Sequence, residues 1–238
     1  MFKHGFFYVL AGICLFACNG GDELPNPDTD IPFVRDHFAA DGLGNSYLTG
    51  FDQVSQRNRD PFIQKNDSKG ARMWRLRYEE TLVSGRGTLL AWHEGKLFAV
   101  FTTDADSAGI TSITRHQALP GAFEGVFQSS YGSRGGPRVS IVAEIDTETG
   151  KIKKGTFLAS RLTDGNTNYL LVDQIGFSQG KIVLRAMSGM WPPGVGTSYV
   201  RFPGLTDADA IEGIFYLRYE LNPDFTAITK AEVLQEPF

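Results

Sequence analysis

The sequence predicts an all-β domain, and three observations lead to this fold class. Short apolar or alternating segments recur along the chain, and each is bounded by Gly, Asn, Asp or Pro, as strands between tight turns are. No stretch after residue 33 keeps the i, i+3, i+4, i+7 apolar pattern of a helix over three turns. The 238 residues include 18 Phe and 27 Gly, a composition that suits strands and turns.

The first 17 residues have the pattern of a signal peptide. Lys3 gives the chain a positively charged start, and residues 5–17 form an apolar run without a charged side chain. A helix needs about 20 apolar residues to cross a bilayer, so this run is too short for a membrane span. A charged start followed by a short apolar stretch is typical of secretory signal peptides. We therefore expect residues 1–17 to direct export and to be removed.

The run ends at Leu15-Phe16-Ala17-Cys18, which resembles the lipobox of bacterial lipoproteins. In that family a leucine lies three residues before the cysteine, and a small residue lies just before it. The resemblance implies transfer of a diacylglyceryl group to the Cys18 thiol and cleavage between Ala17 and Cys18. It further implies a lipid anchor in the cell envelope, and Asn19, which is not an aspartate, favours the outer membrane. The alternative is an ordinary signal peptide, cleaved elsewhere, with an incidental Cys18.

Residues 18–33 are expected to form a disordered tether, and residues 34–238 the β domain. The tether is polar, acidic and rich in proline, so it cannot bury enough apolar surface to fold. Removal of residues 1–17 leaves 221 residues and, because one lysine is lost, a formal charge of −5. Such an acidic domain is not expected to bind nucleic acid. With Cys14 removed and Cys18 acylated, it has no thiol for disulfides or catalysis.

Eight segments show the apolar or alternating pattern of strands. The alternation is clearest over residues 139–145 and 215–221, which predicts one buried and one more exposed face. The segments are Ile63–Lys65, Met73–Tyr78, Leu89–Trp92, Leu97–Thr102, Val139–Ile145, Tyr169–Ile175, Ile182–Ala186 and Phe215–Leu221. The one modest helical signal is a single turn around residues 207–211.

Two kinds of tight turn alternate along the chain. Turns of the first kind lie at residues 41–45, 93–96 and 178–181, and turns of the second kind lie at 66–70, 146–150 and 222–225. This order predicts a repeated unit of four antiparallel strands, with one kind of turn after the first strand and the other after the third. Three such units fit residues 34–80, 86–160 and 166–235. Internal repetition of this kind predicts a stacked or radial architecture.

The first unit resembles one repeat of bacterial β-propeller proteins. It carries Asp41-Gly42-Leu43-Gly44-Asn45-Ser46-Tyr47-Leu48-Thr49-Gly50, then Pro61-Phe62-Ile63-Gln64-Lys65-Asn66-Asp67-Ser68-Lys69-Gly70, and then Trp74. The resemblance implies a β-propeller-like fold of repeated four-stranded antiparallel units. Propellers close with about four to eight blades, whereas the sequence provides three units. Pairing of two chains into a homodimer, a β-sandwich and an irregular barrel are therefore the alternatives.

The two longest connections are where we expect a ligand site, because long loops on a rigid β scaffold commonly carry function. Residues 104–137 and 188–212 would lie on the face opposite the tight turns. Aromatic side chains beside arginine suit a small polar ligand or a protein surface. The candidate ligand-binding residues are His116, Tyr131, Arg134, Trp191, Tyr199 and Arg201. The alternative is that the aromatic residues plug the open end and that the charges are solvated.

Sequence patterns of catalysis and metal binding are missing. His37, His93 and His116 lack the i, i+2 or i, i+4 spacing of metal ligands. The sequence contains no Gly-x-Ser-x-Gly elbow and no Gly-x-x-x-x-Gly-Lys-Ser/Thr loop. We therefore expect no metal and no cofactor.

The leading interpretation is a non-enzymatic, envelope-anchored module that binds a small polar ligand or an envelope protein with its long loops. The first alternative is an envelope hydrolase or lactonase-like propeller enzyme, whose site would be assembled from separate units and would leave no local pattern. The second alternative is a structural subunit of a surface complex.

Overall fold

The computed structural model describes residues 31–78, 83–105 and 117–238. Residues 31–238 form one compact unit. The predicted signal peptide, Cys18 and residues 18–30 of the predicted tether lie outside the described residues. None of the helical structure in the described part of the chain is long and apolar enough to cross a membrane.

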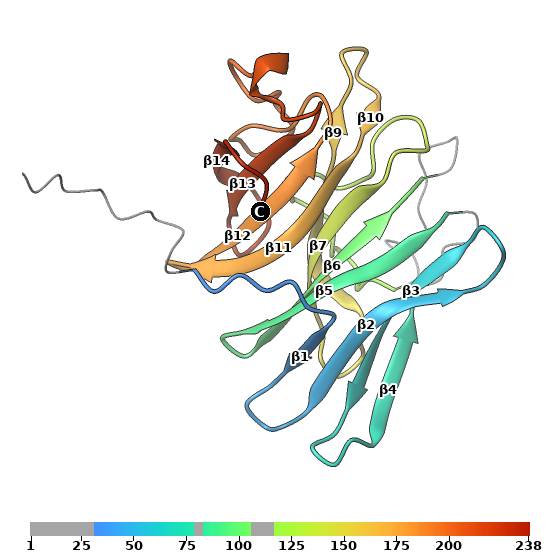
Figure 1. The fold of residues 1–238 in the computed structure, drawn as a ribbon. Helices are drawn as coiled ribbons and strands as arrows, with labels where there is room; N and C mark the ends of the chain where they lie inside the picture. Colours follow the sequence, from blue (N-terminus) through green and yellow to red (C-terminus); the bar gives the residue numbers. More distant parts are fainter. Residues whose placement is uncertain (1–30, 79–82, 106–116) are drawn as a thin grey trace, which may run out of the picture. The chain divides into compact units, whose positions relative to one another are not determined.

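The described residues form an all-β domain, as the sequence predicts (Figure 1). The strands are β1 (Phe38–Ala40), β2 (Ser46–Gln53), β3 (Arg59–Asn66), β4 (Arg72–Arg77), β5 (Gly85–His93), β6 (Lys96–Thr103), β7 (Val139–Ile145), β8 (Ile152–Leu158), β9 (Ser160–Arg161), β10 (Thr167–Asn168), β11 (Leu170–Ser178), β12 (Lys181–Ser188), β13 (Phe215–Leu221) and β14 (Ile228–Leu234). Each of the eight predicted segments overlaps one of these strands. A single 3₁₀ turn, η1 (Asp207–Asp209), lies where the sequence predicts a helical turn.

Consecutive antiparallel strands form three meanders. The first meander, β1–β4, is a separate four-stranded sheet. The second, β5–β8, and the third, β11–β14, belong to one eight-stranded sheet. They join at one position, where Leu170 of β11 pairs in parallel with Val139 of β7. The described sheets close into neither a barrel nor a propeller ring, so the propeller-like interpretation stays a prediction.

The second meander is buried on both faces, because successive side chains of a strand point to opposite sides. Leu90 and Phe101 belong to the hydrophobic cluster shared with β1–β4. Leu89 and Val100 belong to the cluster shared with β11–β14. Strand β6 is covered from both sides, and its stretch Leu97-Phe98-Ala99-Val100-Phe101 is accordingly apolar throughout rather than alternating.

The turn between β7 and β8 holds the first meander in place. Trp74 Nε1 and Lys65 Nζ each donate a hydrogen bond to the carbonyl oxygen of Thr147 at 3.1 Å. The hydroxyl of the fully buried Tyr78 donates to the carbonyl oxygen of Gly150 at 2.6 Å. Gly150 has a φ of +76°, and a Cβ there would lie 2.8 Å from the Trp74 ring. Both the backbone and the packing therefore require glycine at this position.

Candidate functional site

Three of the predicted ligand-binding residues lie together in the connection between β12 and β13. The guanidinium of Arg201 stacks on Trp191, with Cζ 3.3 Å from the ring centroid. The hydroxyl of Tyr199 donates to the backbone carbonyl of Trp191 at 3.0 Å, and Arg161 Cζ lies 4.6 Å from the Tyr199 ring centroid. Burial raises the pKa of Tyr199, and the charges of the two arginines only partly offset this rise. These side chains therefore form one cluster in which they contact one another.

The other three predicted residues have different surroundings. Tyr131 is 1 % exposed in the cluster between the first and second meanders, and its hydroxyl donates to the carbonyl oxygen of Pro137. Arg134 is exposed and has a φ of +59°. His116 lies outside the described residues.

A pocket that the sequence did not predict lies between the second and third meanders and the segment before β1. Its volume is about 300 Å³, which is at the lower end of the range for small-molecule sites. Its main polar lining residues are Arg35, His37, Arg86, Thr88, Arg138 and Asp173, and its apolar ones are Leu89, Leu171, Val172 and Met187. We call it the central pocket.

Two irregularities in strand pairing place polar side chains in the central pocket. Thr88 is skipped in the ladder of β5 with β6, and Asp173 is skipped in the ladder of β11 with β12. Each is the extra residue of a β-bulge, which bends a strand and redirects its side chains. Both bulges lie in the first strand of a meander, and both residues line the pocket. Because bulges are frequent beside functional sites, their paired occurrence marks this pocket as the strongest candidate within the described residues.

Ion pairs compensate some of the arginine charge here. Arg35 forms an ion pair with Asp173. Arg138 forms one with Asp104, with Nε 3.4 Å from Oδ1. Burial raises the pKa of the Asp104 carboxyl, and its bond to Arg138 only partly offsets this rise. Each of these two arginines therefore has one acidic partner.

Arg86 differs from the other two arginines. Its Nε atom is buried and has no hydrogen-bond partner among the described residues. Burial lowers the pKa of Arg86, the like charges of Arg59 and Arg138 lower it further, and Asp104 acts in the opposite sense. An arginine side chain nevertheless stays cationic in proteins. The pocket and its adjoining ion pairs thus combine three guanidinium groups with two carboxylates, which leaves an excess of positive charge.

A second hollow adjoins the central pocket and shares His37, Arg86 and Thr88 with it. This hollow, of about 460 Å³, lies where β2 and β3 meet β5. Gly87 allows the close approach, since a Cβ there would lie 1.8 Å from Oγ1 of Thr49. Phe51 of β2 lines the hollow, and its ring centroid is 5.3 Å from Arg86 Cζ. Arg86 therefore lines both hollows.

Sequence reasoning missed the central pocket because its residues come from several separate segments. A local signal does exist in Gly85-Arg86-Gly87, at the start of β5. Glycine inside a strand pattern often marks a bulge or a close backbone approach, and Gly87 lies beside the bulge at Thr88. Nothing in the local pattern around Asp173 predicts its bulge.

Within residues 31–78, 83–105 and 117–238, no group of three or more His, Cys, Asp or Glu side chains could hold a metal ion. The sequence matches no model of a known protein family and no curated protein. The fold and the pocket define the described chain as an all-β domain with an arginine-rich pocket between its meanders.

Proposed function

We propose that this chain is a cell-envelope lipoprotein whose β domain is a non-enzymatic binding module for a small polar ligand. The observation that carries this function is the central pocket, in which arginines and an aspartate adjoin apolar side chains. A few placed polar groups in an apolar cavity are typical of small-molecule sites. The resemblance of residues 15–18 to a lipobox supports the location, and the outer membrane is the proposed destination.

Ligand binding is tested by screening small polar compounds for an increase in thermal stability. A ligand at about 100 times its Kd should stabilise the fold by about 2.7 kcal/mol. Leu171→Trp would fill the central pocket, because Leu171 lines it. Leu162→Trp is the matched control, since Leu162 is 43 % exposed and is not a lining residue. Compounds should stabilise the wild type and Leu162→Trp but not Leu171→Trp, and stabilisation that persists in Leu171→Trp would place the site elsewhere.

The lipid anchor is tested on the protein purified from its own membranes. We expect the intact mass to equal residues 18–238 plus a diacylglyceryl modification, and we expect fractionation to place the chain with the outer membrane. Cys18→Ala should accumulate as the unprocessed, unlipidated chain, whereas Cys14→Ala should be processed normally. An unlipidated wild-type chain would refute the anchor.

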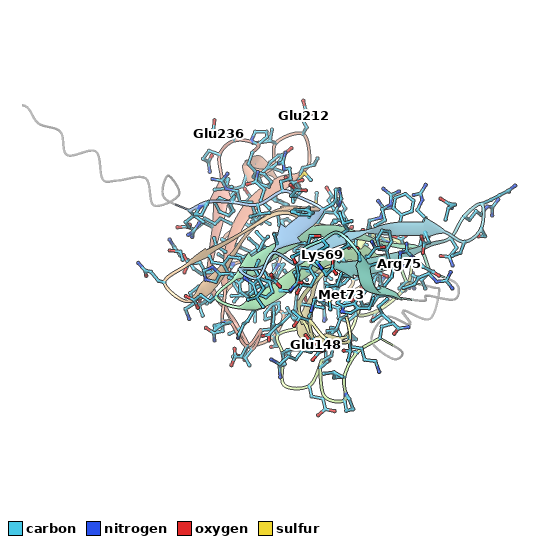
Figure 2. All side chains as sticks on the ribbon, turned by 90° about the horizontal axis from the view of Figure 1, so that it is seen from below. Lys69, Met73, Arg75, Glu148, Glu212 and Glu236 are labelled. Atoms are coloured by element: carbon cyan, nitrogen blue, oxygen red, sulfur yellow. The ribbon has the colours of Figure 1, made fainter. Side chains whose placement is uncertain are left out.

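We also propose that the three meanders are propeller-like blades and that two chains pair, so that the outer face of β1–β4 in each chain, the face turned away from the second meander, packs against the third meander of the other chain. In a propeller each blade packs against the next, and two chains would provide six blades, within the usual range of about four to eight. Phe38 and Leu48 are paired across β1 and β2 and are 44 % and 37 % exposed. On β3, the centroid of the Phe62 ring lies 3.9 Å from Cζ of Arg75 on β4. Figure 2 labels Arg75 and Met73, another residue of β4.

Sedimentation of residues 18–238, with Cys18→Ser to prevent lipid attachment, tests this pairing. A particle of twice the chain mass is expected, and Leu48→Lys should convert it to a monomer. Leu43→Lys is the control, because Leu43 is 83 % exposed in the turn before β2 rather than on the sheet. A monomeric wild type would exclude pairing and would favour the sandwich alternative.

A further inference from the structure

Arg86 is the lining arginine of the central pocket that has no ion-pair partner among the described residues. Arg35 and Arg138 are each bound to a carboxylate, those of Asp173 and Asp104. The Nε atom of Arg86, by contrast, is a buried donor without an acceptor among the described residues. A buried donor without an acceptor is unfavourable, and a carboxylate or phosphate is the acceptor that a guanidinium binds best. Arg86 is also a lining residue of the pocket.

The same pocket has an apolar wall. Leu171 of β11 and Met187 of β12 are directly paired across the two strands, so their side chains lie beside each other on one face. Both are partly exposed and both line the pocket, together with the buried Leu89 and Val172. An inorganic ion would leave this wall uncovered. The apolar part of an organic anion would cover it and remove apolar surface from water.

We propose that the central pocket binds a small organic anion, whose carboxylate or phosphate group contacts Arg86 and whose apolar body packs on Leu171 and Met187. This inference rests on the proposed binding function and names its ligand class. Arg35 and Arg138 add positive potential while they keep their acidic partners. A soluble metabolite and an anionic lipid headgroup both carry this chemistry.

The ligand class is tested by isothermal titration of residues 18–238 carrying Cys18→Ser, a chain that contains the whole compact unit from Ile31 onward. The probes are phenyl phosphate with its neutral counterpart phenol, benzoate with its neutral counterpart benzamide, and inorganic phosphate. At least one of the two aromatic anions should bind about tenfold or more tightly than its neutral counterpart, since charged hydrogen bonds are the stronger ones. It should also bind more tightly than inorganic phosphate. Equal or tighter binding of the neutral counterparts would overturn the proposal.

Arg86→Gln tests the contribution of Arg86 to binding of the anion. The substitution should weaken binding of the aromatic anion by about tenfold or more, because it removes a charged donor. Arg72→Gln is the matched control: it makes the same charge change at an exposed residue of β4 outside the pocket, and it should leave the affinity within about twofold. Thermal unfolding of both variants checks that they fold. If Arg86→Gln does not fold, the comparison of probes on the wild type still decides the question.

The outcomes separate this inference from the proposed function. If neutral compounds bind, if Leu171→Trp abolishes their binding and if both anions fail, the binding module stands and the anionic class is wrong. If no compound of any charge binds at the pocket, both are wrong. Once an anion binds, competition by phosphatidylglycerol vesicles but not by phosphatidylcholine vesicles would identify a lipid headgroup as the source. Binding without such competition would identify a soluble anion, and either source supports the proposal.

Discussion

Aspartate side chains hold several tight turns of the domain. One carboxylate oxygen of each of Asp41, Asp67 and Asp146 accepts two backbone N–H groups of its own turn, at 2.8 to 3.1 Å. Aspartate can imitate a backbone turn in this way, and hydrogen bonds to a carboxylate favour its charged form. The chemistry of these turns is local, which explains why the sequence located them correctly.

Thr149→Ala should raise the pKa of Asp146 toward its ordinary value. The Thr149 hydroxyl donates to Asp146 Oδ1 at 2.8 Å and is the largest cause of the lowered pKa of this carboxyl. Because the pKa of Asp146 is lower in the folded state than its ordinary value of 3.8, its ionised carboxylate stabilises the fold at pH values above 3.8. This contribution is lost as the pH falls through the lowered pKa of the folded state. In Thr149→Ala, the free energy of unfolding should therefore fall less on acidification, because Asp146 contributes less to it.

A carboxyl NMR titration of Asp146 measures this shift. Thr147→Ala is the control, because Lys65 and Trp74 bind the backbone carbonyl of Thr147, which the substitution keeps. An Asp146 pKa that stays the same in Thr149→Ala would contradict the assigned cause.

Tyr78→Phe should lower the free energy of unfolding by about 1 to 3 kcal/mol, because it leaves the buried Gly150 carbonyl without this donor. Burial also raises the pKa of the Tyr78 hydroxyl, so it remains a proton donor at neutral pH. Urea unfolding gives the change, and Tyr216→Phe is the control at a tyrosine whose ring packs on Phe238. A loss no larger than that of Tyr216→Phe would show that the Tyr78 hydrogen bond contributes little.

At the scale of elements, the first meander depends on one turn of the second. Gly150→Ala should destabilise the fold more than Gly95→Ala. Both glycines have a positive φ, at +76° and +78°, but only at Gly150 would the added Cβ meet the Trp74 ring. The strain of a positive φ costs about 1 to 2 kcal/mol at either position, and the clash adds to it at Gly150. Urea unfolding with tryptophan fluorescence measures both variants, and equal losses would refute the close packing of Trp74 on this turn.

The strands could be predicted from the sequence to different degrees. Strands β7 and β13 coincide with the predicted segments Val139–Ile145 and Phe215–Leu221, where apolar residues alternate. The sequence does not predict strand β8, because Lys153, Lys154 and Gly155 interrupt its apolar pattern. In the fold Gly155 allows a close approach to Ala143, since a Cβ there would lie 3.0 Å from the Ala143 Cβ. Tertiary packing, rather than local preference, determines this strand.

The Trp191 cluster and the central pocket also differ in how far the sequence predicts them. Trp191, Tyr199 and Arg201 come from one connection, so sequence proximity was enough to group them. The central pocket combines bulges in two strands with residues of other segments, and only the folded chain brings them together. The charge of the pocket also differs in sign from that of the chain: the chain has a formal charge of −4, whereas arginines outnumber acidic residues in the pocket lining. Net charge therefore excludes some partners but does not identify this pocket.

At the scale of the whole molecule, methionine methyl groups report on three separate surfaces. Residues 18–238 contain Met73, Met187 and Met190. Met187 lines the central pocket, and Met190 precedes the Trp191 cluster and is 38 % exposed. Met73 is 56 % exposed on β4, where Figure 2 labels it. One spectrum of ¹³C-methyl-labelled methionine therefore distinguishes the pocket, the loop cluster and the first meander as sites of binding.

The most direct test of the central claim is to titrate this labelled domain with phenyl phosphate. Because the anion is proposed to pack on Met187, the Met187 methyl signal should shift and saturate, while the signals of Met73 and Met190 stay in place. A shift of Met190 without Met187 would instead place the ligand at the Trp191 cluster. The absence of any Met187 shift at saturating ligand would contradict the central pocket as the binding site.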